Sequence, residues 1–291
     1  MKYYIIAGEA SGDLHGSNLI QGLKQADPGC DIRFWGGDLM AAAGGTMVHH
    51  YKDSAVMGIV EVVRKAGTIS RNMKKCKSDI ISWKPDAVIL IDYPGFNFRI
   101  AKFAKSHGFK TFYYIAPKVW AWMPWRVKRL QRDIDKLFII FPFEKEYFAK
   151  RGIDAIYEGN PLIDSISHDE SQDESDEFFY RRCDLRNAPS IALLAGSRKM
   201  EISYLMPEFV KLEQLLKGTP FANYQLLLAA APSIEPEEYT KYLPEKSRIR
   251  ILYGETYSIL RHSSAALINS GTASLEAALI GVPQVVCYGM N

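Results

Sequence analysis

The stretch from residue 264 to residue 286 constrains the fold more than any other part of the chain. An apolar run, 264–268, breaks at a polar turn that contains Gly271. A segment rich in alanine and leucine follows, and Gly281 and Pro283 separate it from a second apolar run. This order is typical of a strand, a turn, a helix and a second strand. Strands that alternate with helices form parallel sheets, so we predict an α/β protein.

The turn of this unit has the features of an anion site. Ser270 or Thr272 is suited to cap the following helix, and Gly271 lets a ligand approach the amides at the helix start. Glu276 lies one helical turn beyond Thr272, where a carboxylate can accept hydrogen bonds from a pair of ribose hydroxyls. The alternative is an ordinary α/β loop with Glu276 in solvent, and these residues alone do not decide between the two.

The same alternation runs through the whole chain. We predict strands at 3–7, 31–35, 87–91, 111–115 and 136–141 in the first half, and at 190–194, 225–230, 249–252, 265–268 and 284–287 in the second. The segment 167–177 is acidic and almost without apolar residues, as expected of a junction between domains. We therefore predict two Rossmann-like, doubly wound parallel-sheet domains, 1–163 and 164–291, with their functional residues facing a cleft.

The composition is that of a globular protein without a polyanionic partner. Of the 291 residues, 47% are hydrophobic, and the formal net charge of +3 argues against nucleic acid as the main partner. The four cysteines stand apart with no CxxC pair, so neither a zinc site nor a disulfide framework is expected. The N-terminal apolar run is too short for a signal peptide, and no run reaches the ~20 residues of a membrane span. We expect a protein of the cytoplasm or of a membrane face.

The loop after the first strand is a candidate site, because ligands of doubly wound sheets gather at the carboxyl ends of the strands. The loop contains Gly8, Glu9, Ser11, Gly12 and Asp13. Glu9 and Asp13 put negative charge where a dinucleotide pyrophosphate would lie, so dinucleotide binding is not expected. Carboxylates suit the hydroxyl groups of a ligand better.

Asp92 is the carboxylate most suited to catalysis. It follows directly on the apolar run 87–91, which puts it at the carboxyl end of a central strand. We expect partial burial there to raise the pKa of Asp92 toward the range of a general base. The alternative is that Asp92 accepts hydrogen bonds from the turn formed by Pro94 and Gly95.

Two further segments combine apolar or aromatic side chains with basic ones. The first, 56–77, fits a helix lying on a membrane surface or, alternatively, an amphipathic helix packed on the sheet; its apolar candidates are Val60, Val63 and Ile69. The second is a loop with three tryptophans, for which sugar or lipid contacts are the best interpretation: Trp120, Trp122 and Trp125.

The pair Asp133 and Asp135 has the spacing of a DxD metal motif. The pair precedes the strand 136–141 and therefore lies at the end of the sheet away from the ligand edge. We predict no metal site there.

A second phosphate loop is predicted after the strand 190–194. Gly196 and Ser197 free backbone amides at a helix start, and the guanidinium of Arg198 can fork onto a phosphate. Together with the turn at 270–273 and Glu276, this loop favours a nucleotide diphosphate as the ligand of the second domain.

Six segments together resemble the lipid-A-disaccharide synthases: 7–13, 56–62, 117–122, 142–144, 196–198 and 270–276. The resemblance covers essentially the whole chain in order. It implies a GT-B glycosyltransferase that needs neither a metal nor another cofactor. The implied donor is UDP-2,3-diacylglucosamine and the acceptor is 2,3-diacylglucosamine 1-phosphate (lipid X). The implied products are a β-1,6-linked disaccharide 1-phosphate and UDP, formed at the cytoplasmic face of the inner membrane, and a homodimer stays open.

The resemblance also implies roles for the candidate residues. Asp92 would be the base of an inverting transfer. The donor UDP would be held by Gly196, Ser197, Arg198, Ser270, Gly271, Thr272, Ala273 and Glu276. The acceptor side would consist of Glu9, Ser11, Gly12, Asp13, Met57 and Gly58. Acyl or membrane contacts would come from Val60, Val63, Ile69, Trp120, Trp122 and Trp125.

The family pattern runs on beyond Asn291, so the second sheet is expected to lack its last elements. Two alternatives stay open at this point. One is a UDP-sugar epimerase of the same GT-B architecture, and the other is an inactive lipid-binding fragment.

Overall fold

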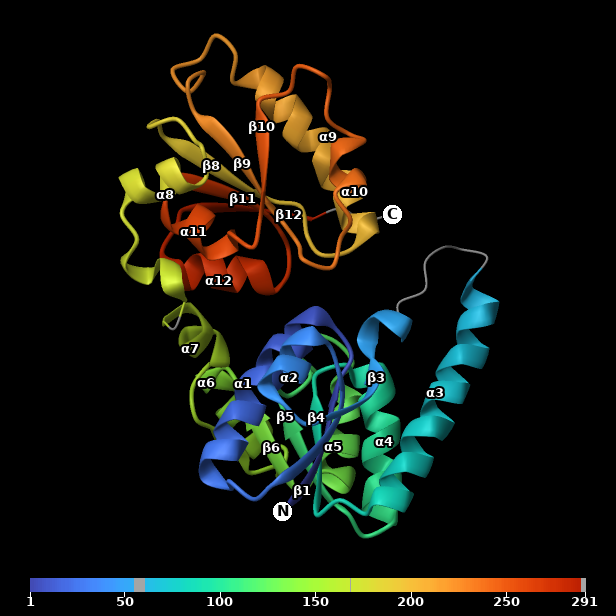
Figure 1. Cartoon of the computed structure of the whole chain (residues 1–291). Helices are drawn as coiled ribbons and strands as arrows, with labels where there is room; N and C mark the ends of the chain where they lie inside the picture. The colour runs from blue at the N-terminus through green and yellow to red at the C-terminus, as the bar shows by residue number, and fades with distance from the viewer. Residues whose placement is uncertain (55–60, 168, 289–291) are drawn as a thin grey trace. The chain divides into compact units, whose positions relative to one another are not determined.

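The structure, a computed structural model, describes residues 1–54, 61–167 and 169–288. The chain divides into two compact units, Met1–Pro161 and Leu162–Asn291. Each unit has one sheet in which every described strand pair is parallel (Figure 1). The predicted fold class, two parallel α/β domains, is confirmed. The predicted domain boundary lies two residues further along than this division.

The first unit contains a seven-stranded sheet with the order β3-β2-β1-β4-β5-β6-β7. Its strands are β1 (Lys2–Ala7), β2 (Asp31–Gly36), β3 (Thr46–His50), β4 (Ala87–Ile91), β5 (Lys110–Tyr114), β6 (Lys136–Ile139) and β7 (Ala155–Tyr157). The two edge strands, β3 and β7, are additions to the five predicted ones. Neither contains a run of buried residues, since β3 is half-buried and β7 has only three residues.

Helices cover both faces of this sheet, because alternate residues of each strand point to opposite faces. Tyr4 and Ile6 of β1 pack against α3, α4 and α5, whereas Ile5 and Ala7 pack against α1 and α2. The helices are α1 (Ala10–Ala26), α2 (Asp38–Ala43), α3 (Glu61–Trp83), α4 (Pro94–Ser106), α5 (Val127–Asp133) and α6 (Pro142–Ala149), with short 3-10 turns at Tyr51–Ser54 and Pro124–Arg126.

The second unit contains a five-stranded sheet with the order β10-β9-β8-β11-β12. Its strands are β8 (Ser190–Leu194), β9 (Gln225–Ala230), β10 (Ile249–Tyr253), β11 (Ala265–Asn269) and β12 (Gln284–Cys287). Two hydrophobic clusters, one on each face, hold the helices α8 (Asp176–Arg182), α9 (Lys199–Leu215), α10 (Glu237–Thr240), α11 (Thr256–Arg261) and α12 (Thr272–Ile280). The predicted strands of this half differ from the observed ones by at most one residue.

The acidic segment between the sheets is anchored by basic side chains of α8 and α11. Arg261 donates to Asp169 at 2.9 Å and to the carbonyl oxygen of Ile166 at 2.7 Å. Arg182 donates to Glu174 at 2.8 Å. The helix α7 (Pro161–Ser167) leads into this segment, which contains the 3-10 turn Glu170–Asp173. Ion pairs therefore hold the acidic segment 167–177 in place, although it has almost no apolar residues to bury.

Each sheet has one point at which the strand order reverses. In the first unit the chain runs outward from β1 to β3 and then returns to β4 beside β1; in the second, β8 and β11 are the corresponding neighbours. Ligands of doubly wound sheets bind beyond the carboxyl ends of the two strands at such a reversal. No helix of the described residues is long and apolar enough to cross a membrane.

Candidate functional site

At the reversal point of the first sheet, the loops after β1 and β4 touch each other. Gly8 follows β1 and lies against the ring of Tyr93, so that a Cβ atom at Gly8 would be 2.3 Å from the Tyr93 ring. Only glycine fits there. Asp92, the residue before Tyr93, therefore lies where the sequence predicts it, at the tip of a central strand and at the ligand edge.

The backbone of this strand tip is held in an unfavourable conformation. Asp92 and Tyr93 have φ angles of 40° and 47°, in the left-handed region that non-glycine residues rarely adopt. Two side chains fix it: the hydroxyl of Tyr113 donates to the carbonyl oxygen of Asp92 at 2.6 Å, and Nδ2 of Asn97 donates to the same oxygen at 2.8 Å. Burial raises the pKa of Tyr113 well above its usual range, so the phenol stays protonated and donates. Such backbone strain is typical of functional sites.

The side chain of Asp92 is exposed, not partly buried as predicted. Because β4 ends at Ile91, the residue after it already leaves the packed layer. The partial burial expected of Asp92 is therefore not found. The role of Asp92 as a base stays a prediction that rests on its position at the strand tip.

Asp13 has a different surrounding from the one predicted. It is only 3% exposed, and its carboxylate accepts hydrogen bonds from the amides of Gly37 (2.7 Å), Leu39 (3.1 Å) and Met40 (3.1 Å). It thus caps α2 and fixes the loop after β2. A direct contact of Asp13 with an acceptor hydroxyl does not fit this arrangement.

The other acceptor-side candidates lie around the start of α1 or outside the described residues. Glu9 is the exposed N-cap residue of α1 and Ser11 is half-buried in its first turn. Gly12 packs closely on β1, since a Cβ atom there would be 3.1 Å from that of Ala7. Three predicted positions lie outside the described residues: Met57, Gly58 and Val60. Val63 belongs to α3, but its side chain is outside the described part.

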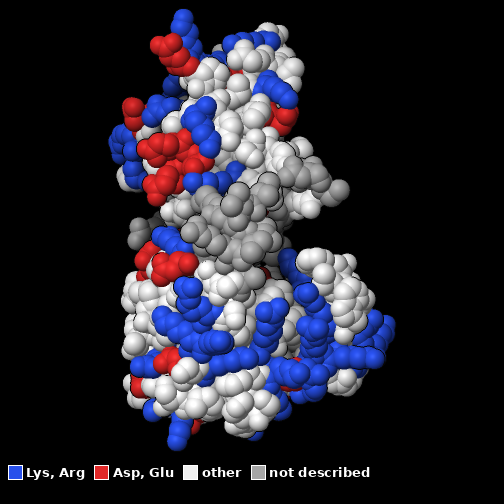
Figure 2. All heavy atoms as spheres, turned by 90° about the vertical axis from the view of Figure 1, so that its right-hand side faces the viewer, with Lys and Arg blue, Asp and Glu red and all other residues white. Residues whose placement is uncertain are grey.

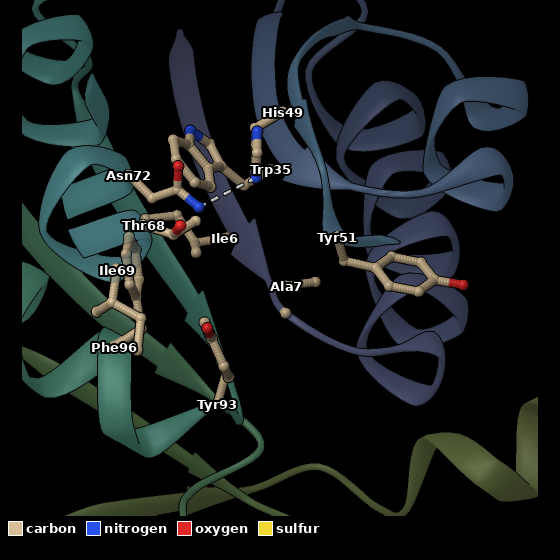
Figure 3. A pocket seen from close by; sticks show the side chains of 11 residues that line it. Ile6, Ala7, Trp35, His49, Tyr51, Thr68, Ile69, Asn72, Tyr93 and Phe96 are labelled. Carbon is tan, nitrogen blue, oxygen red and sulfur yellow. Dashed lines mark hydrogen bonds between the residues drawn. The ribbon is translucent and has the colours of Figure 1, made fainter. Parts of the chain in front are cut away.

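A small pocket lies between α3 and the tips of the strands next to the reversal point (Figure 3). Its volume is about 80 Å³. The lining residues are Ile6, Ala7, Gly8, Trp35, His49, Tyr51, Thr68, Ile69, Asn72, Tyr93 and Phe96. Of the candidate residues predicted from the sequence, only Gly8 and Ile69 line this pocket. The sequence does not reveal the pocket, because its walls come from five separate segments of the chain.

The three tryptophans of the predicted contact loop do not share one environment. Trp120 turns inward, and its indole nitrogen donates to Glu144 Oε1 at 2.8 Å. Glu144 is 1% exposed and also accepts from the amides of Ile140 and Phe141. Trp120 is therefore part of the packing around α6, and the predicted lipid contact does not fit it. Trp122 and Trp125 are 65% and 64% exposed, which leaves them available for an external partner.

Asp133 and Asp135, which have DxD spacing but were predicted to hold no metal, serve the packing of β5 and α5. Asp133 is 3% exposed and is paired with Arg132 at 2.6 Å. Asp135 accepts from the amide of Thr111 at 2.9 Å and pairs with Lys105. Both carboxylates precede β6, at the amino ends of the strands, as the sequence indicates.

In the second unit, a carboxylate of the chain itself accepts hydrogen bonds from the backbone amides of the loop after β8. Glu201 Oε2 accepts hydrogen bonds from the amides of Ser197 at 2.9 Å and Arg198 at 3.2 Å. Gly196 has a φ of 95°, and a Cβ atom there would be 2.3 Å from Glu201 Oε2. The prediction that these two amides are free for a phosphate is therefore wrong for this structure. The side chain of Arg198 is 60% exposed and lies 3.4 Å from Glu201 Oε1.

The turn after β11 is open. The helix α12 begins at Thr272 with Gly271 as its N-cap residue, and no side chain caps it, contrary to the predicted cap by Ser270 or Thr272. Ser270, Gly271 and Thr272 are exposed, and Ala273 is half-buried. The first amides of an uncapped helix attract anions. This turn lies beside the loop after β8, because Ile268 of β11 pairs with Leu194 of β8.

Glu276 lies on α12, and a tyrosine that the sequence did not single out holds its carboxylate. The hydroxyl of Tyr257 on α11 donates to Glu276 Oε1 at 2.9 Å. Burial raises the pKa of Glu276, and the hydrogen bond from Tyr257 opposes this shift. Among the described residues, no hydrogen bond reaches Oε2 of Glu276. A half-buried carboxylate with one remaining acceptor suits a hydroxyl ligand.

Comparison with known proteins identifies the family. Residues 3–291 match the family model described as lipid-A-disaccharide synthetase. The chain belongs to the lipid-A-disaccharide synthase family. It is 38% identical to the lipid-A-disaccharide synthase of Syntrophus aciditrophicus, covering 99% of this chain and 74% of that protein. It is 37% identical to the synthase of Geobacter metallireducens, covering 100% of this chain and 75% of that protein.

The solved structures that resemble this chain confirm its fold but do not bear on its function. UDP-GlcNAc 2-epimerase from Neisseria meningitidis, bound to UDP-GlcNAc, has a TM-score of 0.71 at 13% identity and covers 98% of this chain and 82% of its own. The epimerase from Methanocaldococcus jannaschii, in complex with UDP-GlcNAc and UDP, has a TM-score of 0.69 at 15% identity, with 98% and 83% covered. Because the match to the synthases is much closer in sequence, the synthase interpretation is favoured over the epimerase.

Proposed function

We propose that the chain transfers a 2,3-diacylglucosamine unit from UDP to the 6-hydroxyl of lipid X, which yields a β-1,6-linked disaccharide 1-phosphate and UDP. Membership of the lipid-A-disaccharide synthase family is the observation that carries this proposal. The geometry supports it, because polar groups gather at the reversal point of each sheet. The first unit is then the acceptor domain and the second is the donor domain.

The donor diphosphate binds, in this proposal, at the uncapped start of α12. The amides of Thr272 and Ala273 and the positive end of the helix dipole meet the phosphates. The exposed guanidinium of Arg198, on the neighbouring loop, adds forked hydrogen bonds. Because the amides of Ser197 and Arg198 stay hydrogen-bonded to Glu201, we assign phosphate binding to α12 and to the Arg198 side chain. These groups stabilise UDP as the leaving group without the help of a metal.

Glu276 recognises the ribose of UDP. Its Oε1 is engaged by Tyr257, and Oε2 accepts a hydrogen bond from a ribose hydroxyl. A carboxylate in this role distinguishes a ribonucleotide from its deoxy analogue, because the deoxy compound leaves the half-buried acceptor without a partner.

Asp92 takes the proton of the attacking 6-hydroxyl. Inverting transfer is a single displacement at the anomeric carbon, so one base at hydrogen-bond distance from the nucleophile suffices. The strained backbone at Asp92 and Tyr93, fixed by Tyr113 and Asn97, supports this assignment because it holds the backbone from which the carboxylate projects.

Peripheral contact with the cytoplasmic face of the inner membrane is part of the proposal, because both substrates carry acyl chains. Between residues 67 and 132 the chain has fourteen Lys and Arg but only three Asp and Glu. The helices α3, α4 and α5 pack side by side on one face of the first sheet. Where the structure describes side chains, the exposed basic residues of these helices are Arg71, Lys74, Lys75, Arg99, Lys102, Lys105, Lys128, Arg129 and Arg132. Figure 2, viewed from the right of Figure 1, has Lys and Arg crowded over the first unit.

This basic face is suited to anionic headgroups, to which each nearby Lys or Arg contributes about 1 kcal/mol. The exposed Trp122 and Trp125 precede α5 and add side chains that favour the membrane interface. Sedimentation with vesicles tests the contact. Binding to vesicles of anionic lipid that is lost in high salt supports it, and equal affinity for neutral vesicles would contradict it.

Product analysis is the test of the activity. The purified chain is mixed with UDP-2,3-diacylglucosamine and lipid X, and mass spectrometry should detect the disaccharide 1-phosphate together with UDP. Incubation with UDP-GlcNAc alone should give no change at the sugar C2. Epimerised sugar without any disaccharide would replace this proposal by the epimerase. Light scattering of the same preparation tests whether the chain forms a homodimer.

A further inference from the structure

We propose that the pocket between α3 and the strand tips of the first unit binds the first carbon atoms of one acyl chain of the acceptor. This inference rests on the proposed function, which brings an acylated sugar to Asp92. It adds a hydrocarbon site that lies inside the fold, apart from any contact of the protein with a lipid surface.

The walls of the pocket are those of a hydrocarbon site. Ile6 and Ala7 form one side from β1, and Ile69 closes the opposite side from α3 (Figure 3). Three further lining residues are aromatic rings in mutual contact: Trp35 lies 5.6 Å from Phe96 between ring centroids, and Tyr93 stacks on Phe96 at 5.5 Å. Trp35 is 5% exposed and Phe96 is 4% exposed, so the walls are fixed by the core.

The few polar groups at the pocket do not make a sugar site. His49 and Asn72 face each other at 3.5 Å, and the hydroxyl of Tyr51 points away from the pocket in Figure 3. Burial, followed by the charge of Lys75, lowers the pKa of His49, so its ring is neutral at physiological pH. A sugar ring needs hydrogen-bond partners around its edge, whereas an alkyl chain needs only apolar surface.

The size of the pocket fits part of a chain. An apolar cavity of about 150 Å³ holds a benzene molecule, which has six carbon atoms. By the same measure, the 80 Å³ of this pocket accommodates about three carbon atoms. Only the beginning of a long chain is therefore enclosed, and the rest of it passes out beside α3.

The position of the pocket fits the acceptor. Two of its lining residues, Gly8 and Tyr93, belong to the two loops that meet at the reversal point. Tyr93 directly follows Asp92, the proposed base. The acyl chains of the acceptor are attached to the same sugar ring as the 6-hydroxyl that Asp92 deprotonates. A ring held at Asp92 therefore brings its acyl groups within reach of the pocket mouth.

Filling the pocket tests the inference. Thr68→Trp puts an indole into the space from the α3 side, and Ser70→Trp makes the same change at an exposed residue of α3 that does not line the pocket. With a long-chain acceptor, Thr68→Trp should lose about fiftyfold in kcat/KM, which corresponds to about 2.3 kcal/mol or three buried methylene groups. With the diacetyl analogue, which has no chain to bury, the two variants should be equal.

Binding measurements separate this inference from the proposed function. The affinity for the long-chain acceptor is measured without donor, by titration calorimetry, for both variants and for a milder filling variant, Thr68→Leu. A graded loss through Leu to Trp, with unchanged UDP affinity, supports the pocket even if no disaccharide is formed. Active protein whose chain-length preference is the same in Thr68→Trp, Thr68→Leu and Ser70→Trp overturns the pocket and leaves the transferase intact.

Discussion

Replacing Glu276 by glutamine should stabilise the fold while weakening nucleotide binding. The substitution keeps the size of the side chain and an oxygen that accepts from the Tyr257 hydroxyl, which lies 2.9 Å from Glu276 Oε1. It removes a charge whose ionisation the folded state disfavours, because burial raises the pKa of this carboxyl. The residue is therefore expected to be retained for the ligand at a cost in stability.

The pH dependence of the stabilisation follows from the raised pKa. Below the unfolded-state pKa of about 4.3, Glu276 is neutral in both states and the glutamine variant gains nothing. As the pH rises through the higher pKa of the folded protein, the wild type must keep a charge that burial disfavours and loses stability relative to the variant. The difference in melting temperature should therefore be absent in acid and should grow as the pH rises through the folded-state pKa.

The loss of affinity is set by one hydrogen bond. Because Tyr257 occupies Oε1, we expect one ribose hydroxyl to bind Oε2, and a hydrogen bond to a charged group contributes roughly 1.5–3 kcal/mol. The dissociation constant of UDP should rise by about ten- to a hundredfold. The constant for 2′-deoxy-UDP and 3′-deoxy-UDP should be compared in the same calorimetric titrations. A variant that binds UDP as tightly as the wild type and keeps its preference for the ribonucleotide would refute the role of Glu276.

Three further changes test the loops at the reversal points. Asp92→Asn should lower kcat by about 10²–10⁴-fold, as expected for loss of a general base, and leave the UDP-induced rise in melting temperature unchanged; near-normal turnover would end the assignment. Tyr113→Phe removes the donor 2.6 Å from the Asp92 carbonyl and should cost about 1–3 kcal/mol of stability in urea unfolding, with a fall in kcat but not in UDP affinity. Glu201→Ala uncaps α9 and should cost about 1 kcal/mol in the same unfolding assay, and an unchanged midpoint would contradict the capping role.

The fold was predictable because each strand of the second sheet is a short apolar run bounded by turn residues. The run 225–230, for example, is buried at every position and was predicted to the residue. β3 was missed because it contains two histidines and lies half-buried at the edge of its sheet. Periodicity detects burial, so a strand with little burial leaves no signal.

The candidate site was predictable at the level of loops but not of individual atoms. A strand tip locates Asp92 and the turn at 270–273 because the topology of a parallel sheet fixes its ligand edge. Gly196 and Ser197 by themselves do not tell whether the amides of their loop are free, because a nearby side chain can compete for these amides. Glu201 follows Arg198 by three residues, the spacing of a capping box, and this signal predicts the occupied amides of the β8 loop. The partner of Glu276, Tyr257, comes from a different helix and has no local signal.

Four of the carboxylates near the two reversal points divide into two pairs. Asp13 and Glu201 accept hydrogen bonds from backbone amides and hold the loops in place, the first from three amides and the second from two. Asp92 is exposed at its strand tip, and Glu276, which accepts from the hydroxyl of Tyr257, keeps one oxygen for a ligand. Removing the charge of Asp13 or Glu201 should therefore lower stability, whereas removing that of Asp92 or Glu276 should lower activity or affinity without unfolding the protein. Urea unfolding and UDP binding are measured for each of the four variants. A variant with the result expected of the other pair would show that the surroundings of its carboxylate change when substrate binds.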